Sequence, residues 1–534
     1  MTILIFFIVS YILLSIALYF VFPKAGVEGW KGLVPGLNFI EWCEIIGRPK
    51  WWAALLLIPI VNIFIFAGMS VDLVRSFGKF GLGSSALAVF YPPAILGMLG
   101  TKAEEKYLGP VLLQEREYFT EMREAKEAKQ ERKLNKLIKN NPYRKSAGRE
   151  WTESIFFAVF AAAFIRMFLV EAYVIPTPSM EGSLMVGDFL FVSKTSYGIR
   201  TPMTVAMVPL LHNRLPVTGG ESYLKSPSLP YYRLPALRDI KRNTPFVFNW
   251  PVGDSVYITS NRSYTLNQIK QQPNWQVYDR ELAEKVRTKD FVTRPIDKKD
   301  HYIKRCVGIA GDSLQVIDRK IYINGVIEKD PINTQFKYQV RFPGNSFNKR
   351  KLPEWGIDDS DYWQGPSGVG GFFMTEAQAD LLRSLDPQIQ VTLAPGPQKP
   401  DDKLFPFDQK NYPGWSLDNY GPIYIPKKGV TTPLDLTNLS MYKRIISVYE
   451  HNDLEVKDGK IYINGKEANE YTFKQDYYWA MGDNRHNSED SRAWGYVPHD
   501  HIVGKPLFIW FSTKNGSISN GINWNRIFKS ANVD

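Results

Sequence analysis

A serine between rigid neighbours is the first candidate for chemistry in this chain. The segment Ile175–Met180 reads IPTPSM and begins just beyond an apolar stretch. Its two prolines restrict the backbone on either side of Thr177, which would hold Thr177 and Ser179 in fixed relative positions. A proline-rich turn that contains serine is normally only a turn, so Ser179 needs a partner that can activate its hydroxyl.

A buried lysine is the best candidate for that partner. The six histidines form no HExxH pattern, and the sequence has no GxSxG nucleophile elbow. A lysine acts as a base only when uncharged, so its pKa of about 10.4 must fall by several units, which burial can achieve. Lys304 lies in the strand-like, largely apolar run Tyr302–Ile309. Strand alternation would point Lys304 inward and Arg305 toward water; the alternative is two ordinary exposed basic residues at a strand end.

A weak internal repeat supplies a second lysine. Tyr302–Arg305 precedes the run KIYING at Lys320–Gly325, and Met441–Arg444 precedes the same run at Lys460–Gly465. Two similar hairpins would explain this repeat without shared chemistry. The residues alone do not decide between Lys304 and Lys443.

The third candidate is the polar segment Met481–Arg492, which reads MGDNRHNSEDSR. It is too polar for a strand and too dense in hydrogen-bonding groups for a plain linker. Asp and Arg two residues apart can pair across a tight loop. The alternatives are a solvated turn or a metal-binding loop, although the oxygen spacing of an EF-hand is absent.

Apolar stretches place these residues next to a membrane. Crossing a bilayer as a helix takes about 20 apolar residues. The first stretch lacks a basic segment and an AxA cleavage site, so we expect an uncleaved anchor and not a signal peptide. Buried core helices are the alternative for the second and third. The four stretches are Ile3–Phe22, Trp51–Val71, Phe80–Thr101 and Ile155–Val170.

Charge predicts the orientation. Residues 102–150 hold thirteen Lys and Arg against nine Glu, and short basic loops stay in the cytoplasm. We therefore expect about three spans in residues 1–100, a charged cytoplasmic loop in 101–150 with a solvated helix over Glu115–Lys139, and a last span in 151–172. The N-terminus and everything from about Tyr173 onward would then lie outside. Arg75 and Lys79 in the second loop are the counter-signal.

The second half predicts a mainly β domain. Short β-prone runs alternate with turn residues, and Asn324-Gly325 and Asn464-Gly465 are typical hairpin turns. Segments rich in Pro, Gly and polar residues at about 201–238 and 332–437 read as insertions, and Glu376–Leu385 is a possible short helix in the second one. The predicted strands include Phe189–Val192, Phe246–Phe248, Ser255–Ile258, Lys320–Ile323 and Leu507–Trp510.

Composition excludes several classes of protein. With 44% hydrophobic and 22% charged residues, the chain is neither disordered nor collagen-like. The two cysteines, Cys43 and Cys306, exclude a disulfide scaffold, a CxxC zinc site and an iron–sulfur cluster. The net charge of +11 is not gathered into a basic stripe interleaved with aromatic residues, so we expect no nucleic-acid partner. We also expect no metal and no cofactor.

Taken together, the three clusters resemble the bacterial type I signal peptidases, the Ser–Lys endopeptidases of the inner membrane. The family's boxes occur in order: PTPSM at Pro176–Met180 followed by Gly187-Asp188, YIKRCVGIAGD at Tyr302–Asp312, and GDNRHNSEDSRAWG at Gly482–Gly495, with a weaker box at Phe246–Phe248. The resemblance implies the signal-peptidase fold, in which antiparallel β-sheets form the catalytic domain and transmembrane helices precede it.

The resemblance also implies roles. Ser179 is the nucleophile and Lys304 the base; Lys304 is preferred over Lys443 because Gly-x-x-Gly-Asp follows it. The backbone N–H of Ser179 and the hydroxyl of Thr177 form the oxyanion hole, and Ser488 hydrogen-bonds and orients the lysine. The loop is supported by an Asp490–Arg492 ion pair together with Asp483 and Arg485.

The implied function is removal of signal peptides from secretory preproteins at the outer face of a bacterial inner membrane. Shallow apolar pockets would select the small residues that precede the cleavage site, with Val174, Met180, Leu184 and Ile303 as candidate walls. The chain departs from the family at Gly182-Ser183, where Pro-Thr is usual, and in its extra spans and insertions. An inactive membrane scaffold, or a peptidase dedicated to few substrates, is the alternative.

Overall fold

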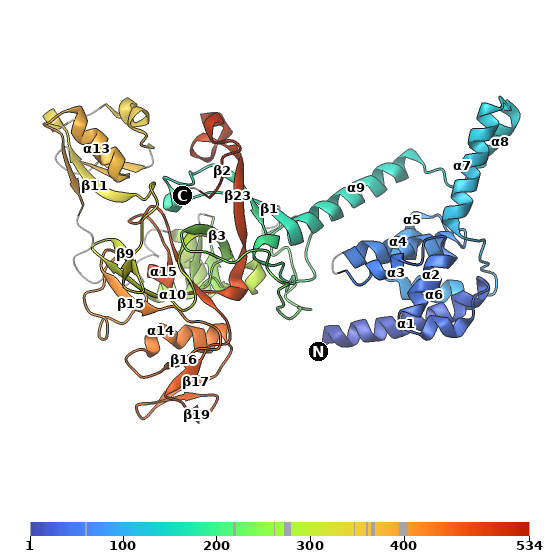
Figure 1. The fold of residues 1–534 in the computed structure, drawn as a ribbon, viewed down its shortest axis with the longest axis horizontal. Coiled ribbons are helices and arrows are strands. Elements are labelled where there is room, and N and C mark those ends of the chain that lie inside the picture. The colour runs from blue at the N-terminus through green and yellow to red at the C-terminus, as the bar shows by residue number, and fades with distance from the viewer. Residues whose placement is uncertain are drawn as a thin grey trace. The chain divides into compact units, whose positions relative to one another are not determined.

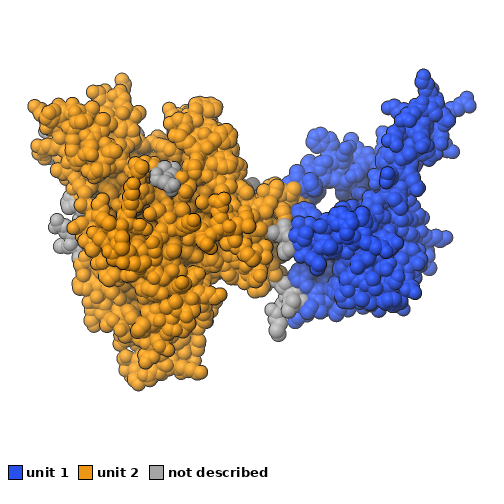
Figure 2. Space-filling view, in the orientation of Figure 1, with its two compact units in different colours: residues 1–159 blue, residues 160–534 orange. Residues whose placement is uncertain are grey.

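The computed structural model describes residues 2–58, 61–216, 220–260, 262–271, 279–345, 348–358, 361–364, 369–394 and 404–532. The chain divides into two compact units, Met1–Val159 and Phe160–Asp534 (Figure 2). The first is helical and the second is mainly β (Figure 1). Each unit is described separately.

Helices build the first unit around an apolar core. The core joins residues from separate helices, among them the fully buried Leu18, Trp42, Leu73 and Leu96. The helices are α1 Thr2–Lys24, α2 Leu37–Ile45, α3 Trp52–Leu55, α4 Val61–Arg75, α5 Leu82–Phe90, α6 Pro92–Thr101, α7 Val111–Glu127, α8 Glu131–Lys139 and α9 Ala147–Phe164.

Two helices in the described residues are long and apolar enough to cross a membrane, Ile5–Lys24 and Ala147–Leu169. Helices α5 and α6 pass the same test only as a pair, and they meet at a bend of 117°. The bend falls where Pro92 and Pro93 follow Tyr91, because a proline disfavours helix in the preceding residue. The expected second stretch is divided between α3 and the 15-residue α4, with residues 59–60 outside the described chain. At 1.5 Å per residue, α4 alone is shorter than the roughly 30 Å of a bilayer core.

The charged region differs from the single helix expected over Glu115–Lys139. It forms α7 and α8, separated at Lys129, whose φ of +52° ends the first helix. The two helices are joined by a bond from the Tyr118 hydroxyl to the Leu137 carbonyl oxygen at 2.6 Å. These tertiary contacts favour a hairpin over a continuous helix, and local charge patterning carries no sign of them.

Antiparallel sheets form the second unit, which confirms the predicted fold class. The largest sheet has the strand order β1-β2-β23-β3-β7-β21-β22. β7 lies between β3 and β21, and the side chains on both of its faces are buried from Lys304 to Gly308. The strands are β1 Val170–Val174, β2 Asp188–Ser193, β3 Thr244–Asn249, β7 His301–Gly308, β21 Tyr477–Met481, β22 Val497–Pro498 and β23 Ile502–Ser512.

The remaining strands form smaller sheets. Four strands form the order β10-β9-β8-β15, and three form β5-β4-β6. These strands are β4 Ser255–Ile258, β5 Ser263–Thr265, β6 Val292–Thr293, β8 Ser313–Ile317, β9 Lys320–Ile323, β10 Val326–Ile327 and β15 Tyr420–Tyr424; β16 Thr431–Pro433 pairs with β20 Glu470–Thr472, and β17 Leu454–Lys457 with β18 Lys460–Ile463 and β19 Lys466–Glu467.

The local predictions for this unit are confirmed. The five predicted β-prone runs lie in β2, β3, β4, β9 and β23. At both hairpin turns the Asn and the Gly have positive φ, 53° and 80° at Asn324-Gly325, as a two-residue type I′ turn requires. The possible helix Glu376–Leu385 is α13, and Thr375 begins it with a capping box.

The two insertions differ in structure. In the described part of 201–238 the chain makes isolated bridges without regular strands. The second insertion contains its own sheet, in the order β12-β13-β11-β14, packed with α13 around a buried core that includes Tyr338, Phe372 and Leu382. Its strands are β11 Phe336–Arg341, β12 Tyr362–Gln364, β13 Val369–Met374 and β14 Gln390–Leu393.

The sequence repeat is a pair of hairpins and goes no further. KIYING forms β9 in one copy and β18 in the other. Tyr302–Arg305 lies in strand β7, whereas Met441–Arg444 lies in helix α14, Leu439–Arg444. The two preceding segments therefore have different structures despite their similar sequences.

Candidate active site

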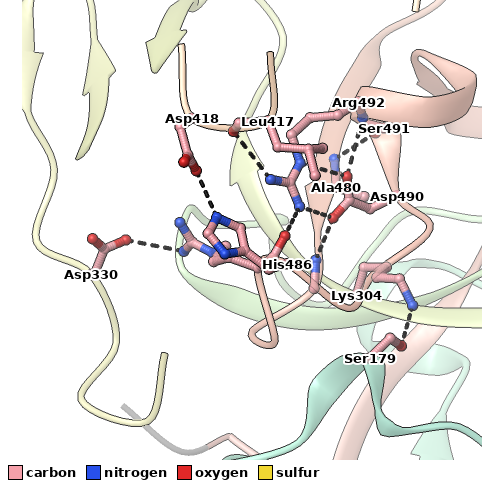
Figure 3. Close-up of polar contacts among 12 residues, drawn as sticks. Ser179, Lys304, Asp330, Leu417, Asp418, Ala480, His486, Asp490, Ser491 and Arg492 are labelled. Carbon is pink, nitrogen blue, oxygen red and sulfur yellow. Dashed lines mark hydrogen bonds and ion pairs between the residues drawn. The ribbon is translucent and has the colours of Figure 1, made fainter. Parts of the chain in front are cut away.

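Ser179 and Lys304 meet in the buried part of the large sheet. Ser179 lies in a single 3₁₀ turn, Pro178–Met180, between β1 and β2, and only 8% of it is exposed. Lys304 lies on β7 opposite Phe246 of β3 and is 4% exposed. Lys304 Nζ lies 2.7 Å from Ser179 Oγ (Figure 3).

The surroundings of Lys304 favour its neutral form. Burial lowers its pKa from 10.5 to about 8, against the opposing effect of the Asp490, Glu489 and Asp483 carboxylates. Its Nζ also donates to the carbonyl oxygen of Ile303 at 3.1 Å. A neutral amine in this position can accept the proton of the serine hydroxyl.

Arg305 does not face water, so that expectation is wrong. It is 1% exposed and forms a bidentate ion pair with Asp483, with both N–O distances at 2.7 Å. The reason is that other elements cover both faces of β7 here, so every residue from Lys304 to Gly308 is buried. Breaking such a buried pair by removing one partner typically costs about 3–5 kcal/mol.

The Asp490–Arg492 ion pair is present and fully buried. Arg492 Nη2 lies 2.8 Å from Asp490 Oδ2, and the backbone N–H of Gly482 donates to the same oxygen at 3.1 Å. Arg492 Nη2 also donates to the carbonyl oxygen of Arg485 at 2.6 Å. The pair thus holds both ends of the segment that follows β21. Burial acts to raise the pKa of Asp490, but the Arg492 charge and the hydrogen bonds to the carboxylate together outweigh burial, so the pKa of Asp490 is lowered.

Asp483 and Arg485 do not pair with each other. Asp483 binds Arg305, while Arg485 pairs with Asp330 at 3.0 Å, just before the second insertion. Spacing along the loop suggested a local pair. The observed partners lie more than 150 residues away in sequence, where no local signal reveals them.

Ser488 does not hydrogen-bond Lys304. Its hydroxyl is buried and makes no hydrogen bond of normal geometry with the described residues, although it lies close enough to Asp490 to lower the pKa of that carboxyl. It is nevertheless beside the nucleophile turn. A Cβ on Gly482 would lie 2.2 Å from Ser488 Oγ and 2.4 Å from the Ser179 carbonyl oxygen, so only glycine at 482 permits this approach.

The oxyanion candidates lie together on the cavity wall. Thr177 and Ser179 both line the cavity that contains Lys304. The Ser179 carbonyl oxygen accepts from the backbone N–H of Asn484 at 3.2 Å, which fixes the orientation of the turn. Thr177 is exposed, with φ −136° and ψ 152°.

The departure from the family at Gly182-Ser183 has a structural explanation. Gly182 has φ +89°, and a Cβ there would lie 2.2 Å from the backbone oxygen of Asn333 in the second insertion. Ser183 accepts a hydrogen bond from Arg305 Nη2 at 3.3 Å. Glycine at 182 therefore lets the insertion pack directly on the nucleophile loop.

The insertion also contacts the third cluster, which the sequence did not indicate. Gln335 bridges the loop by accepting from the Arg485 N–H and donating to the Asp483 carbonyl oxygen, both at 2.9 Å. His486 bonds to Asp418 at 2.6 Å (Figure 3). The only feature of the sequence that pointed to these contacts was the density of polar groups in Met481–Arg492, because buried polar groups need hydrogen-bond partners.

A cavity of about 510 Å³ opens beside Ser179 and Lys304. Three of the four predicted pocket walls, Val174, Met180 and Ile303, line it. Leu184 is not among its lining residues; it is fully buried in the apolar cluster that also contains Met180. Tyr302, Trp250, Arg262 and Glu489 complete much of the wall, and none of them was predicted as a site residue.

The second lysine lies elsewhere. Lys443 is exposed on helix α14, whereas Lys304 is buried on a strand. Among the described residues, no group of three His, Cys, Asp or Glu side chains could hold a metal ion. Cys43 and Cys306 are both free and buried.

Two family models match parts of the chain. Residues 148–364 and 468–511 match the family model described as signal peptidase, peptidase S26, and residues 30–110 match a family of unknown function, DUF5684. The gap between the two matched segments covers part of the second insertion.

Curated relatives extend along most of the chain. Signal peptidase I of Buchnera aphidicola subsp. Baizongia pistaciae is 22% identical over 404 residues, 73% of this chain and 86% of the relative. Signal peptidase I of Helicobacter pylori strain 26695 is 23% identical over 377 residues, 68% of this chain and 87% of the relative. Signal peptidase I of Aquifex aeolicus is 47% identical over 49 residues, 9% of this chain and 19% of the relative. With the Ser179–Lys304 contact in the matched region, the chain belongs to the signal peptidase family of serine peptidases.

Proposed function

We propose that this protein removes N-terminal signal peptides from secretory preproteins by a Ser–Lys acyl-enzyme mechanism. The observation that carries the proposal is the 2.7 Å contact between Lys304 Nζ and Ser179 Oγ at a lysine whose pKa falls to about 8. The family's relatives named signal peptidase I support the substrate class.

The chemistry follows from that contact. Neutral Lys304 takes the hydroxyl proton as Ser179 Oγ attacks the scissile carbonyl carbon. The backbone N–H of Ser179 and the hydroxyl of Thr177 stabilise the oxygen that becomes negative. The C–N bond breaks as protonated Lys304 gives its proton to the leaving amine. Lys304, neutral again, then accepts a proton from water as the water oxygen attacks the acyl-enzyme carbonyl carbon. It gives that proton to Ser179 Oγ as the ester C–O bond breaks and the signal peptide leaves with a free carboxylate.

The buried loop positions the lysine. In this proposal Asp490 and Arg492 hold the loop that carries Ser488, and Asp483 anchors the neighbouring Arg305 on the same strand. Ser488 orients Lys304 once substrate has excluded water, since its buried hydroxyl has no other hydrogen bond of normal geometry among the described residues. Catalytic hydrogen bonds often tighten only in the substrate complex.

The cavity supports selection of small residues before the cleaved bond. Val174, Met180 and Ile303 give it an apolar sector beside Ser179. Leu184 acts only through packing against this wall. Apolar burial favours a small aliphatic side chain there, while bulky side chains meet the buried Met180.

Anchoring in a bacterial inner membrane completes the proposal. Helices Ile5–Lys24 and Ala147–Leu169 are long and apolar enough to span, and α5 with α6 supplies a third crossing if the bent pair spans as one. Residues 101–150 lie in the cytoplasm and the β domain from about residue 173 lies outside. A serine only ten residues past the last apolar helix then reaches bonds at the outer membrane surface.

The test uses the full chain purified in detergent with a preprotein that carries a signal peptide. We expect cleavage by the wild type and by Lys443→Ala, and none by Ser179→Ala or Lys304→Ala. Lys443→Ala is the matched control because Lys443 is exposed on α14. Equal cleavage by Ser179→Ala and the wild type would refute the mechanism.

A further inference from the structure

The cavity at Ser179 has two chemically different sectors. Part of its apolar lining belongs to two core clusters that share Ile303, one with Ile175, Met180 and Leu190 and the other with Tyr173 and Val247. The other sector contains a charged pair, Arg262 and Glu489, with Arg262 Nη2 3.3 Å from Glu489 Oε2. The two side chains are 38% and 34% exposed, so an incoming chain can reach both charges.

Neighbouring side chains hold the pair in place. Gln268 Nε2 donates to Glu489 Oε1 at 2.7 Å, and the Arg262 guanidinium lies 5.0 Å from the centre of the Tyr264 ring. Arg262 comes from the start of the small sheet β5-β4-β6, whereas Glu489 follows Ser488 in the loop after β21. Two separate elements therefore bring opposite charges to one wall of the cavity.

The charged pair lies on the Lys304 side of the cavity. The Tyr302 ring is 5.4 Å from Lys304 Nζ. Burial lowers the pKa of Lys304 and raises that of Tyr302, the Glu489 carboxylate acts to raise both, and the Arg262 charge acts to lower that of Tyr302. Lys304 and Tyr302 therefore lie within electrostatic reach of the charged pair in the same cavity.

We propose that Arg262 and Glu489 form a subsite that reads the charge of the first two residues after the cleaved bond. The inference rests on the proposed function. Apolar residues before the bond occupy the apolar sector, and Lys304 must reach the leaving amine. The chain beyond that amine therefore passes Lys304 and enters the charged sector. There Glu489 attracts basic side chains and Arg262 attracts acidic ones.

Because the two charges are paired, the wild type discriminates weakly between basic and acidic substrates. Removing one charge takes away the counter-charge that this pair supplies, so the remaining charge acts more strongly on the substrate. Single exposed charge interactions are worth about 0.2–1 kcal/mol, which corresponds to a change of up to about fivefold. Each single variant should therefore change the ratio of kcat/KM between acidic and basic substrates without abolishing cleavage.

The experiment compares preproteins that differ only by Lys, Gln or Glu at one position. The positions are the first and second residues after the cleaved bond and the second residue before it. We expect Glu489→Gln to raise the Glu-to-Lys ratio of kcat/KM about three- to fivefold at the positions after the bond, and Arg262→Gln to lower it. The exchange Arg262→Glu with Glu489→Arg should restore a ratio near that of the wild type. Glu467→Gln is the matched control, since Glu467 pairs with Lys460 at 2.9 Å on an exposed hairpin.

Two results would overturn the subsite. The first is that Glu489→Gln and Arg262→Gln both have the same Glu-to-Lys ratio of kcat/KM as Glu467→Gln. The second is that the substrate charge changes kcat/KM only at the position before the cleaved bond. Ser179→Ala separates this failure from that of the proposed function. If cleavage requires Ser179 and the ratios stay flat, only the subsite is wrong. If the wild type does not cleave the Gln substrate, or Ser179→Ala cleaves it equally, both proposals fall.

Discussion

The pH dependence of cleavage should report the buried lysine directly. Lys304 is 4% exposed, and burial lowers its pKa from 10.5 to about 8. At pH 7 a lysine with a pKa near 8 is neutral in about one molecule in ten, against about one in 3,000 for an ordinary lysine. The lowered pKa therefore makes the neutral base about 300 times more abundant at neutral pH.

The assay is kcat/KM from pH 6 to 10 for the detergent-solubilised enzyme, with a preprotein that has no titratable side chain near the cleaved bond. We expect the rate constant to rise about tenfold per pH unit below about pH 8 and to level off above it, because only neutral Lys304 accepts the serine proton. Lys443→Ala should give the same curve. A midpoint near that of free lysine, or a rate that falls as the pH rises through 8, would refute the reasoning.

The lowered pKa of Lys304 should also appear in the stability of the folded protein, where burying this lysine is a cost. Since the folded pKa lies below the unfolded one, unfolding takes up a proton between about pH 8 and 10.5, and wild-type stability rises with pH across that window. Below it, the folded protein carries a buried charge at a cost of about 3 kcal/mol. Lys304→Met should therefore be inactive yet melt at a higher temperature than the wild type at pH 7, with the difference shrinking as the pH rises from about 8 to 10.5. An equal or lower melting temperature at pH 7 would contradict this account.

Three further predictions concern the supports of the site. Asp483→Ala leaves Arg305 buried without its partner and should lower the free energy of unfolding by about 3–5 kcal/mol, measured by denaturant titration; a loss under about 1 kcal/mol would show that the pair is not needed. Gly182→Ala introduces a Cβ 2.2 Å from the Asn333 carbonyl oxygen at φ +89°, so kcat should fall at least tenfold as the nucleophile loop shifts, and an unchanged kcat would refute the packing. Val174→Trp fills part of the cavity and should raise KM for alanine-containing sites more than it lowers kcat, in steady-state assays; unchanged preference before the bond would remove Val174 from the pocket.

Local features of this protein were predictable from sequence because short-range physics controls them. The Asn-Gly turns adopt positive φ since few other residues tolerate it, and α13 begins at Thr375 with a capping box. Proximity of Ser179 to Lys304 followed from the family's ordered boxes and not from spacing, because 125 residues separate them.

The tertiary structure alone decided the partners of the charged groups. Strand alternation suggested an exposed Arg305, yet Arg305 is buried and pairs with Asp483. The two-residue spacing allowed a pair between Asp483 and Arg485, yet Arg485 pairs with Asp330. Which carboxylate meets which guanidinium depends on how strands distant in sequence come together, and side-chain alternation says nothing about whether a second layer covers the outer face. The sequence by itself thus determined the fold class, the strands of the β domain and the candidate site residues, while packing determined the electrostatic environment around them.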